Sequence, residues 1–274
     1  MFWIYEIPTW LLCFLIIGPI LLFSTTVLIL RRTWIYHRFR LSDDTNDGIN
    51  GYFSAMGVLY GLLLGLIAVS SWENLEYVGT LANKEATSVA QLYRDVSTLD
   101  QPAKTKLHQE LEDYLNYVIN VAWPAHKLGK VPTGGSVILT RFLATLSTYH
   151  TRNVEQQVFL AEVITAYNKL IEDRRLRMHA VDDTGIDSIT WIVILVGGGL
   201  TLIGSFFIHL PTLGGHLFMN SLFSILLGLM IFMLVAIDQP FRSELGITPI
   251  AYINTLAGLK DLDINNNSTI DASK

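Results

Sequence analysis

The sequence predicts an all-α, polytopic membrane protein with four transmembrane helices and a helical extramembrane insert between the second and the third. Its composition is the first indication: 51% of the 274 residues are hydrophobic, 16% are charged, and the mean hydropathy is +0.40. Soluble domains carry about 25% charged residues. The second indication is that the charge is missing from four separate runs, Leu11–Leu30, Tyr52–Trp72, Ser188–Ile208 and Leu217–Ile237.

Each uncharged run has about 20 residues, the length at which an α-helix crosses a hydrocarbon core of about 30 Å. Buried helices of a large soluble protein are the alternative, but they would show a polar face. We interpret the first run as an anchor and not as a cleaved signal peptide, because no Lys or Arg precedes it and Arg31 and Arg32 follow it. Cys13 lies inside this run, and we expect it to be a small apolar filler.

The distribution of arginine predicts the topology. The short loop 31–49 contains Arg31, Arg32, Arg38 and Arg40, and short loops rich in Lys and Arg stay in the cytoplasm. We therefore expect a multi-pass protein of the cell inner (plasma) membrane, with this loop inside and the insert 73–187 outside. The insert itself carries 12 Lys/Arg and 15 Asp/Glu, and segments of this length cross largely regardless of charge.

The second span continues into the insert without a turn. We predict one helix that leaves the membrane at Trp72 and ends near Thr98. Its outer half carries an apolar seam at 3–4 spacing, which Glu85 interrupts; the seam consists of Leu75, Val78, Ala82, Val89, Leu92 and Val96.

The rest of the chain divides as follows. Three further helices are predicted in the insert, from Asp100–Pro102 to Trp123–Pro124, over about 137–148, and from Asn153 to the basic cluster Arg174–Arg177. Residues 188–237 form a second transmembrane hairpin, whose loop 209–216 turns at Pro211 and the Gly214–Gly215 pair. Residues 238–274 form an extramembrane segment that we expect to be disordered after Lys260.

Three glycines of the second span, Gly57, Gly61 and Gly65, lie four residues apart and therefore share one helix face. A stripe without Cβ atoms allows another helix to approach closely. The stripe predicts helix packing, either within the chain or between subunits around a pore.

The four spans contain no Asp, Glu, Lys or Arg. Proton-coupled transporters and pumps usually need ionisable groups at membrane depth, whereas a passive channel can work with an apolar constriction. Leu59, Leu63 and Ile67 lie off the glycine stripe and are the candidate pore or gate residues.

Two acidic residues lie at the ends of spans. Glu73 follows the second span and Asp238 follows the fourth, so the predicted topology puts both at the same membrane edge. They are candidates for an ion-binding ring in an oligomer. The alternative, which we favour, is that both are solvated helix ends.

The sequence predicts no catalytic, cofactor-binding or metal-ligating residue, and so no enzyme. No nucleophile motif, Gly-rich phosphate loop or HExxH is present. His209 and His216 flank the predicted hairpin loop without a carboxylate or cysteine, which makes a poor metal site, and His126 and His150 have no partner visible in the sequence. The net charge of −5 provides no basic surface for nucleic acid. The expected partners are the lipid bilayer, ions and further copies of the chain.

Four stretches carry a resemblance to a known family: NDGINGYFSAMGVLYGLLLGLIAVSSWEN (46–74), NKEATSVAQLYRD (83–95), VAWPAHKLG (121–129) and DQPFRSELGITP (238–249). Together they resemble the bacterial membrane proteins of the bestrophin-like domain family, over about 46–258. The residues that best match its motifs at the membrane edge are Trp72, Glu73, Asn74, Asp238, Pro240 and Phe241. The resemblance implies four spans and a helical insert, without a known activity.

A more distant likeness is to the bestrophins, pentameric anion channels that calcium gates in animals. Their fourth span is followed by an Asn-Pro-Phe-Gly-Glu stretch that belongs to a calcium clasp. Gln239, Pro240 and Phe241 resemble its start, but Arg242 and Ser243 replace the Gly, and Glu244 alone remains of the acidic run. Bestrophins also keep the corresponding insert in the cytoplasm, opposite to the side that the arginines here predict.

Two functions are consistent with these observations. The first is an oligomeric, passive, anion-conducting channel with the second span at the pore, and the resemblance implies a pentamer. The second is a non-conducting membrane sensor or assembly protein that acts through its helical insert.

Overall fold

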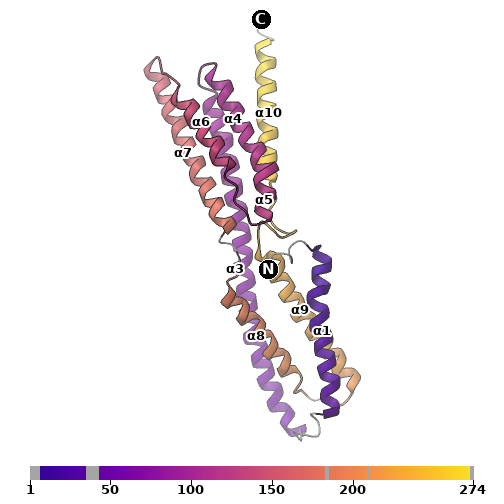
Figure 1. Ribbon diagram of the computed structural model, residues 1–274. Helices are drawn as coiled ribbons and strands as arrows, with labels where there is room; N and C mark the ends of the chain where they lie inside the picture. The colour runs from indigo at the N-terminus through magenta and orange to yellow at the C-terminus, as the bar shows by residue number, and fades with distance from the viewer. Residues whose placement is uncertain (1–6, 35–42, 183–184, 209, 272–274) are drawn as a thin grey trace. The chain divides into compact units, whose positions relative to one another are not determined.

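The structure, a computed structural model, describes residues 7–34, 43–182, 185–208 and 210–271, with side chains except at 31–34, 43–46, 182 and 262–271. The regular elements of this part are all helical (Figure 1). They are α1 (Thr9–Trp34), α3 (Asp43–Val96), α4 (Ala103–Tyr117), the π-helical turn η2 (Val118–Ala122), α5 (Trp123–Lys127), α6 (Gly134–Ser147), α7 (Val154–Asp182), α8 (Ser188–Ser205), α9 (Leu213–Asp238) and α10 (Ile250–Asp271).

The predicted fold class is confirmed, because α1, α3, α8 and α9 are long and apolar enough to cross a membrane. The chain forms two compact units. The membrane unit comprises Met1–Leu75 and Gly185–Leu245, and the insert unit comprises Glu76–Thr184 and Gly246–Lys274.

Helix α3 confirms the predicted continuous helix and extends it at the start. It has 54 residues, from Asp43 to Val96, or about 80 Å at 1.5 Å per residue. The predicted loop 31–49 is therefore too long, since α1 reaches Trp34 and α3 begins at Asp43. No proline interrupts α3, and once a helix has formed, each further residue adds one backbone hydrogen bond, which favours the longer helix. Residues 38 and 40 and the side chains of 31 and 32 lie outside the described residues, so the topology stays a prediction.

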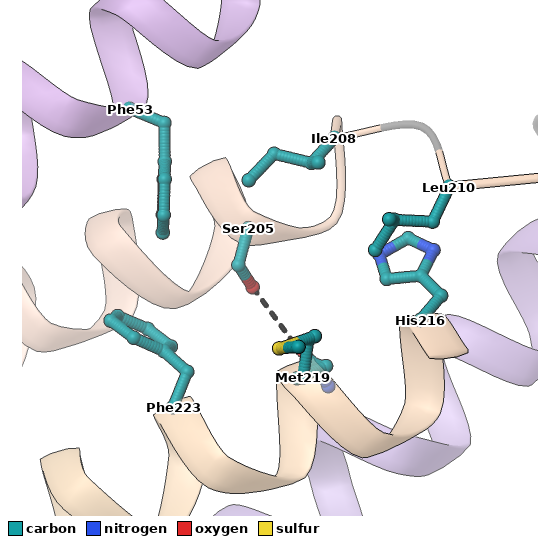
Figure 2. Close-up of a pocket in the computed structure, with 8 residues that line it drawn as sticks. Phe53, Ser205, Ile208, Leu210, His216, Met219 and Phe223 are labelled. Atoms are coloured by element: carbon teal, nitrogen blue, oxygen red, sulfur yellow. Dashed lines mark hydrogen bonds between the residues drawn. The ribbon is translucent and has the colours of Figure 1, made fainter. Parts of the chain in front are cut away.

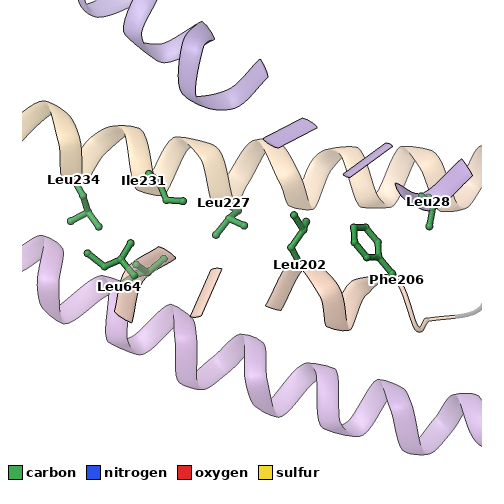
Figure 3. Packing of buried hydrophobic residues seen from close by; sticks show 8 residues of the cluster. Leu28, Leu64, Leu202, Phe206, Leu227, Ile231 and Leu234 are labelled. Atoms are coloured by element: carbon green, nitrogen blue, oxygen red, sulfur yellow. The ribbon is translucent and has the colours of Figure 1, made fainter. Parts of the chain in front are cut away.

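The membrane unit packs around one apolar cluster. Figure 3 shows its side chains reaching from α1, α3, α8 and α9 into the space between these helices; they are Leu28, Leu64, Ile194, Leu202, Phe206, Leu227, Ile231 and Leu234. Lipid tails are as apolar as these side chains, so contact between helices in a membrane depends on close packing and hydrogen bonds. Both are found at the contact of α3 with α8, where the Tyr60 hydroxyl donates to the carbonyl of Ile194 at 2.7 Å.

Glycines allow this contact. A Cβ added to Gly197 would lie 2.6 Å from the Tyr60 ring, and one added to Gly198 would lie 2.9 Å from the Tyr60 hydroxyl. Both distances are shorter than real Cβ contacts, so the glycines of α8 provide the space that Tyr60 of α3 occupies.

The insert unit is a helical bundle with a largely apolar core. The predicted seam is buried from Val78 to Val96, with Val78, Val89 and Val96 all 0% exposed. Buried side chains of α4, α6 and α7 join this core, among them Leu111, Phe142 and Leu170. The predicted helices of the insert are all present, and their boundaries shift by only a few residues, except that the first contains the turn η2.

Two segments differ from the prediction. Gly214 and Gly215 do not form the hairpin turn but lie in the first turn of α9, because the Thr212 hydroxyl caps that helix by accepting from the Gly215 amide. Helix α10 continues to Asp271, where we expected disorder after Lys260. Its first half is anchored by buried Tyr252 and Leu259, and an anchored helix extends into polar sequence.

Candidate functional site

The membrane half of α3 has one face covered by its own chain. Leu64 is 3% exposed, Ser71 is buried, and Tyr60 and Ile67 pack against the apolar cluster. These residues recur at intervals of three and four, so they mark one side of the helix. The rest of the span remains uncovered by the described residues of this chain.

The predicted glycine stripe lies beside the covered face. A Cβ added to Gly57, Gly61 or Gly65 would have no described heavy atom within 4 Å. At Gly197 and Gly198, in contrast, Tyr60 of the same chain occupies the space where a Cβ would lie. Packing against the described residues of the chain therefore does not account for the stripe.

The face opposite to Leu64 is apolar and exposed. Leu62 and Leu66 are two residues away from Leu64 in each direction, which places each about 160° around the helix. Both are more than 60% exposed, and Leu59 and Val69 extend the stripe by one turn at either end. Of the candidate gate residues, Leu59 lies on this face, Leu63 is half-buried, and Ile67 turns toward the cluster.

The acidic residues at the membrane edge do not share one environment. Glu73 is exposed and follows Trp72, which is half exposed, while Asn74 is half-buried. Asp238 is 5% exposed, and its Oδ1 accepts the backbone amide of Ile186 at 2.5 Å.

The structure therefore corrects both readings for Asp238, whereas exposed Glu73 remains consistent with a solvated helix end. Asp238 is neither a member of an exposed ring nor a solvated helix end. It is a buried acceptor that ties the end of α9 to the segment before α8. Sequence alone did not reveal this role, because its partner is a backbone amide 52 positions away.

The second carboxylate of the 238–244 segment also binds the start of a helix. Oε2 of Glu244 accepts from the amide of Thr9 at 2.8 Å and from its hydroxyl at 2.5 Å. These bonds lower the pKa of Glu244 and suit an anion at the N-terminus of α1. Pro240 and Phe241, which lie between the two carboxylates in the sequence, are also buried. The segment 238–244 is therefore held against the membrane unit at both ends and near its middle.

The insert unit buries a charged pair, one member of which is Glu85, the polar position in the seam. Glu85 is 0% exposed and Arg177 of α7 is 1% exposed. The guanidinium makes two hydrogen bonds to the carboxylate: Nε donates to Oε2 at 2.5 Å, and Nη2 donates to Oε1 at 3.0 Å. The Tyr114 hydroxyl donates to Oε1 at 2.5 Å. Burial raises the pKa of Tyr114 well above its usual value, so it remains a neutral donor.

Aromatic rings and a histidine complete this ionic cluster. The Arg177 guanidinium lies 5.8 Å from the ring centroid of Trp123 and 5.6 Å from that of Tyr252, within cation–π range. Its Nη1 donates to Nδ1 of His126 at 3.2 Å. Since arginine can only donate, Nδ1 carries no proton and the proton of the neutral ring lies on Nε2. Burial, with Arg177 and Arg174 nearby, lowers the pKa of His126 to about 3.

Metal binding finds no support in the geometry. Across residues 7–271, apart from the gaps in the description, no three His, Cys, Asp or Glu side chains come together as a metal site would require. His209 lies outside the described residues, so the expectation that it makes only a poor metal site with His216 remains a prediction. His150 is exposed.

Four apolar spans, a hairpin of the last two, and a helical bundle inserted after the second define an integral membrane protein of the helical class. The chain belongs to the bestrophin-like domain family, whose model matches residues 18–252. No curated protein matches the chain.

Solved structures agree with the fold. A variant of a bacterial bestrophin homologue from Klebsiella pneumoniae is similar to this chain with a TM-score of 0.68 and 14% identity, over 92% of this chain and 98% of that one. Another structure of a homologue from this organism gives a TM-score of 0.65 and 14% identity, over 90% and 97% of the two chains. At this identity, the likeness shows a shared fold.

Proposed function

We propose that the protein is an oligomeric, passive, anion-conducting channel whose pore is lined by the membrane half of α3. The observation that carries the proposal is that α3 leaves two different apolar faces uncovered. One is the glycine stripe, suited to close contact with another helix, and the other is the stripe of Leu59, Leu62, Leu66 and Val69. A helix that packs on its own chain, contacts a neighbouring subunit and lines a pore needs three faces. In α3 these are the covered face, the glycine stripe and the exposed leucine stripe.

The pore requires several copies, because the described helices of one membrane unit pack on a filled apolar cluster. Family analogy supports five copies around one axis. The exposed leucine stripe then forms an apolar constriction that gates by dewetting. Since Leu62 and Leu66 lie farthest from the covered face, they replace Leu63 and Ile67 as the favoured gate residues, with Leu59 retained.

The channel assignment is tested by stoichiometry and current together. We expect the purified protein to be a stable homo-oligomer in detergent and to give anion currents in liposomes. Leu66→Ala should widen the constriction and raise the current several-fold, whereas Leu226→Ala on α9, an equally exposed span leucine, should leave it unchanged. A protein that is strictly monomeric in detergent and in lipid nanodiscs excludes the channel and leaves the non-conducting sensor or assembly protein.

The topology is tested separately. Arg31 and Arg32 support a cytoplasmic loop and an external insert in the inner membrane. A cysteine placed at exposed Asn153 in a Cys13→Ser background should then react with an impermeant thiol reagent in intact spheroplasts. Labelling only after lysis would put the insert in the cytoplasm.

A further inference from the structure

Four carboxylates of the described membrane unit lie at the edge where α1 and α8 begin and α9 ends, and three of them bind backbone amides. Asp187 caps α8 by accepting from two amides of its first turn. Asp238 accepts an amide just before α8, and Glu244 accepts the first amide of α1. Glu73 is the fourth. It is exposed, and it forms no hydrogen bond or ion pair with the residues that the structure describes.

Several neutral polar side chains of the spans are used inside the membrane unit. Ser205 of α8 donates to Oδ1 of Asn220 of α9 at 3.0 Å, a bond drawn in Figure 2. Nδ2 of Asn220 donates to the hydroxyl of Ser24 of α1, and Tyr60 of α3 donates to a carbonyl of α8. These bonds join helices of one chain, whereas no contact within the described membrane unit accounts for the carboxylate of Glu73.

Glu73 lies on the same face of α3 as the exposed leucine stripe. It follows Leu66 by seven residues and Leu62 by eleven, which puts it within about 20° of both around the helix axis. The rise of 1.5 Å per residue places it about 10 Å beyond Leu66. No charged residue occurs between Asp47 and Glu73. The apolar face therefore becomes acidic at one point, just past the end of the leucine stripe.

We propose that Glu73 sets the charge preference of the pore. If α3 turns its leucine stripe toward the ion path, it turns the Glu73 carboxylate toward the mouth of that path, and each copy of the chain adds one carboxylate there. Rings of Asp or Glu attract cations and repel anions. Glu73 thus keeps the channel only weakly selective for anions. The inference rests on the proposed channel function, because a single chain forms no ring.

The test is the permeability ratio of chloride to potassium, taken from the reversal potential of the purified full-length protein in lipid bilayers with a KCl gradient. Glu73→Gln keeps the size of the side chain and removes its charge. The ratio should rise about threefold in about 0.15 M salt, which is the effect of one carboxylate about 6 Å from the ion path. Glu73→Lys reverses the charge and should raise the ratio further.

The matched control is Asp187→Asn. It removes the same charge from an exposed position at the same edge, and asparagine caps a helix as well as aspartate does. The control should leave the ratio unchanged. An equal rise in Asp187→Asn and Glu73→Gln overturns the proposal, because any surface charge at this edge would then suffice.

The outcomes distinguish this inference from the proposed function. Currents with the same ratio in the wild type and in both Glu73 variants overturn the role of Glu73 and leave the channel in place. A wild-type protein that carries no current contradicts the channel itself, and the inference with it.

Salt and thiol chemistry show whether the carboxylate acts through its electric field. In about 1 M KCl, where charges are screened beyond about 3 Å, the difference between the wild type and Glu73→Gln should nearly vanish. In Glu73→Cys with Cys13→Ser, a thiol reagent that carries a sulfonate should restore the wild-type ratio. A reagent of similar size that carries a trimethylammonium group should raise it. A difference that persists in 1 M salt, or equal effects of the two reagents, overturns the proposal.

Discussion

The two units of this protein bury polar groups in opposite ways. The membrane unit uses neutral pairs: Tyr60 with the carbonyl of Ile194, and the amide of Asn220 with Ser24 and Ser205. The insert unit buries a full ion pair, Glu85 with Arg177, at 0% and 1% exposure. In both units these buried polar groups have hydrogen-bond partners. The free energy lost when a partner is removed is expected to be several-fold larger for the ion pair than for the neutral pairs.

The difference follows from what drives association in each environment. Transmembrane helices gain no hydrophobic free energy when apolar surface moves from lipid to protein. The cost of burying a charge between them would therefore not be offset. In the insert unit, water surrounds the bundle and the burial of apolar residues such as Val78, Leu92 and Leu111 drives folding. That gain offsets the desolvation of one ion pair, which joins α3 to α7 and accepts a hydrogen bond from Tyr114 of α4.

The largest expected effect is the loss of one member of the ion pair. Arg177→Met should leave the Glu85 carboxylate buried without a cation and lower the stability of the bundle by about 3–5 kcal/mol. Thermal unfolding followed by circular dichroism measures this in the full-length protein. Arg175→Met removes the same charge from an exposed position of the same helix and should have almost no effect.

The double variant sharpens the comparison. Glu85→Met with Arg177→Met removes both charges, so it should be markedly more stable than Arg177→Met alone. If the double variant is as unstable as the single one, the cluster contributes mainly packing, and charge burial does not distinguish the two units.

A smaller effect should come from pH. The fold keeps His126 neutral with a pKa of about 3, against about 6.5 in the unfolded chain. Unfolding therefore takes up a proton as the pH falls below 6.5, and the stability contributed by neutral His126 is lost between pH 6.5 and 3. From pH 7 to pH 5 this amounts to about 2 kcal/mol.

The measurement is the shift in melting temperature between pH 7 and pH 5, compared with His126→Gln. The amide can still accept from Arg177 but does not titrate in this range. The variant should lose clearly less stability than the wild type on acidification. Equal losses would mean that other groups, such as the carboxylate of Glu244, dominate the acid response.

The sequence predicted much of the architecture because its signals are local. Uncharged runs defined the spans, and the absence of a break between Trp72 and Val96 predicted the continuity of α3. The apolar seam predicted the buried face in the insert. Each of these depends on residues within one helix.

The sites were less predictable because their partners are distant. Glu85 was visible only as a polar break in the seam, and its pairing with Arg177 appears only in the fold. Asp238 looked like a span end because a bond to the Ile186 amide leaves no trace in the sequence. Tyr60 was missed altogether, although the paired glycines of α8 were a signal that a large side chain lies against them.

The smallest effect is expected where the membrane unit uses a neutral bond. Tyr60→Phe removes the hydroxyl that donates to Ile194 and keeps the ring beside Gly197. Hydrogen bonds between helices in membranes are worth about 0.6 kcal/mol on average, so the unit should lose about that much. Gly197→Ala, which puts a Cβ 2.6 Å from the same ring, should cost more, because the packing and not the bond holds α3 against α8. If unfolding in mixed detergent micelles shows Tyr60→Phe to be the more damaging of the two, polar bonding would matter in the membrane unit as it does in the insert.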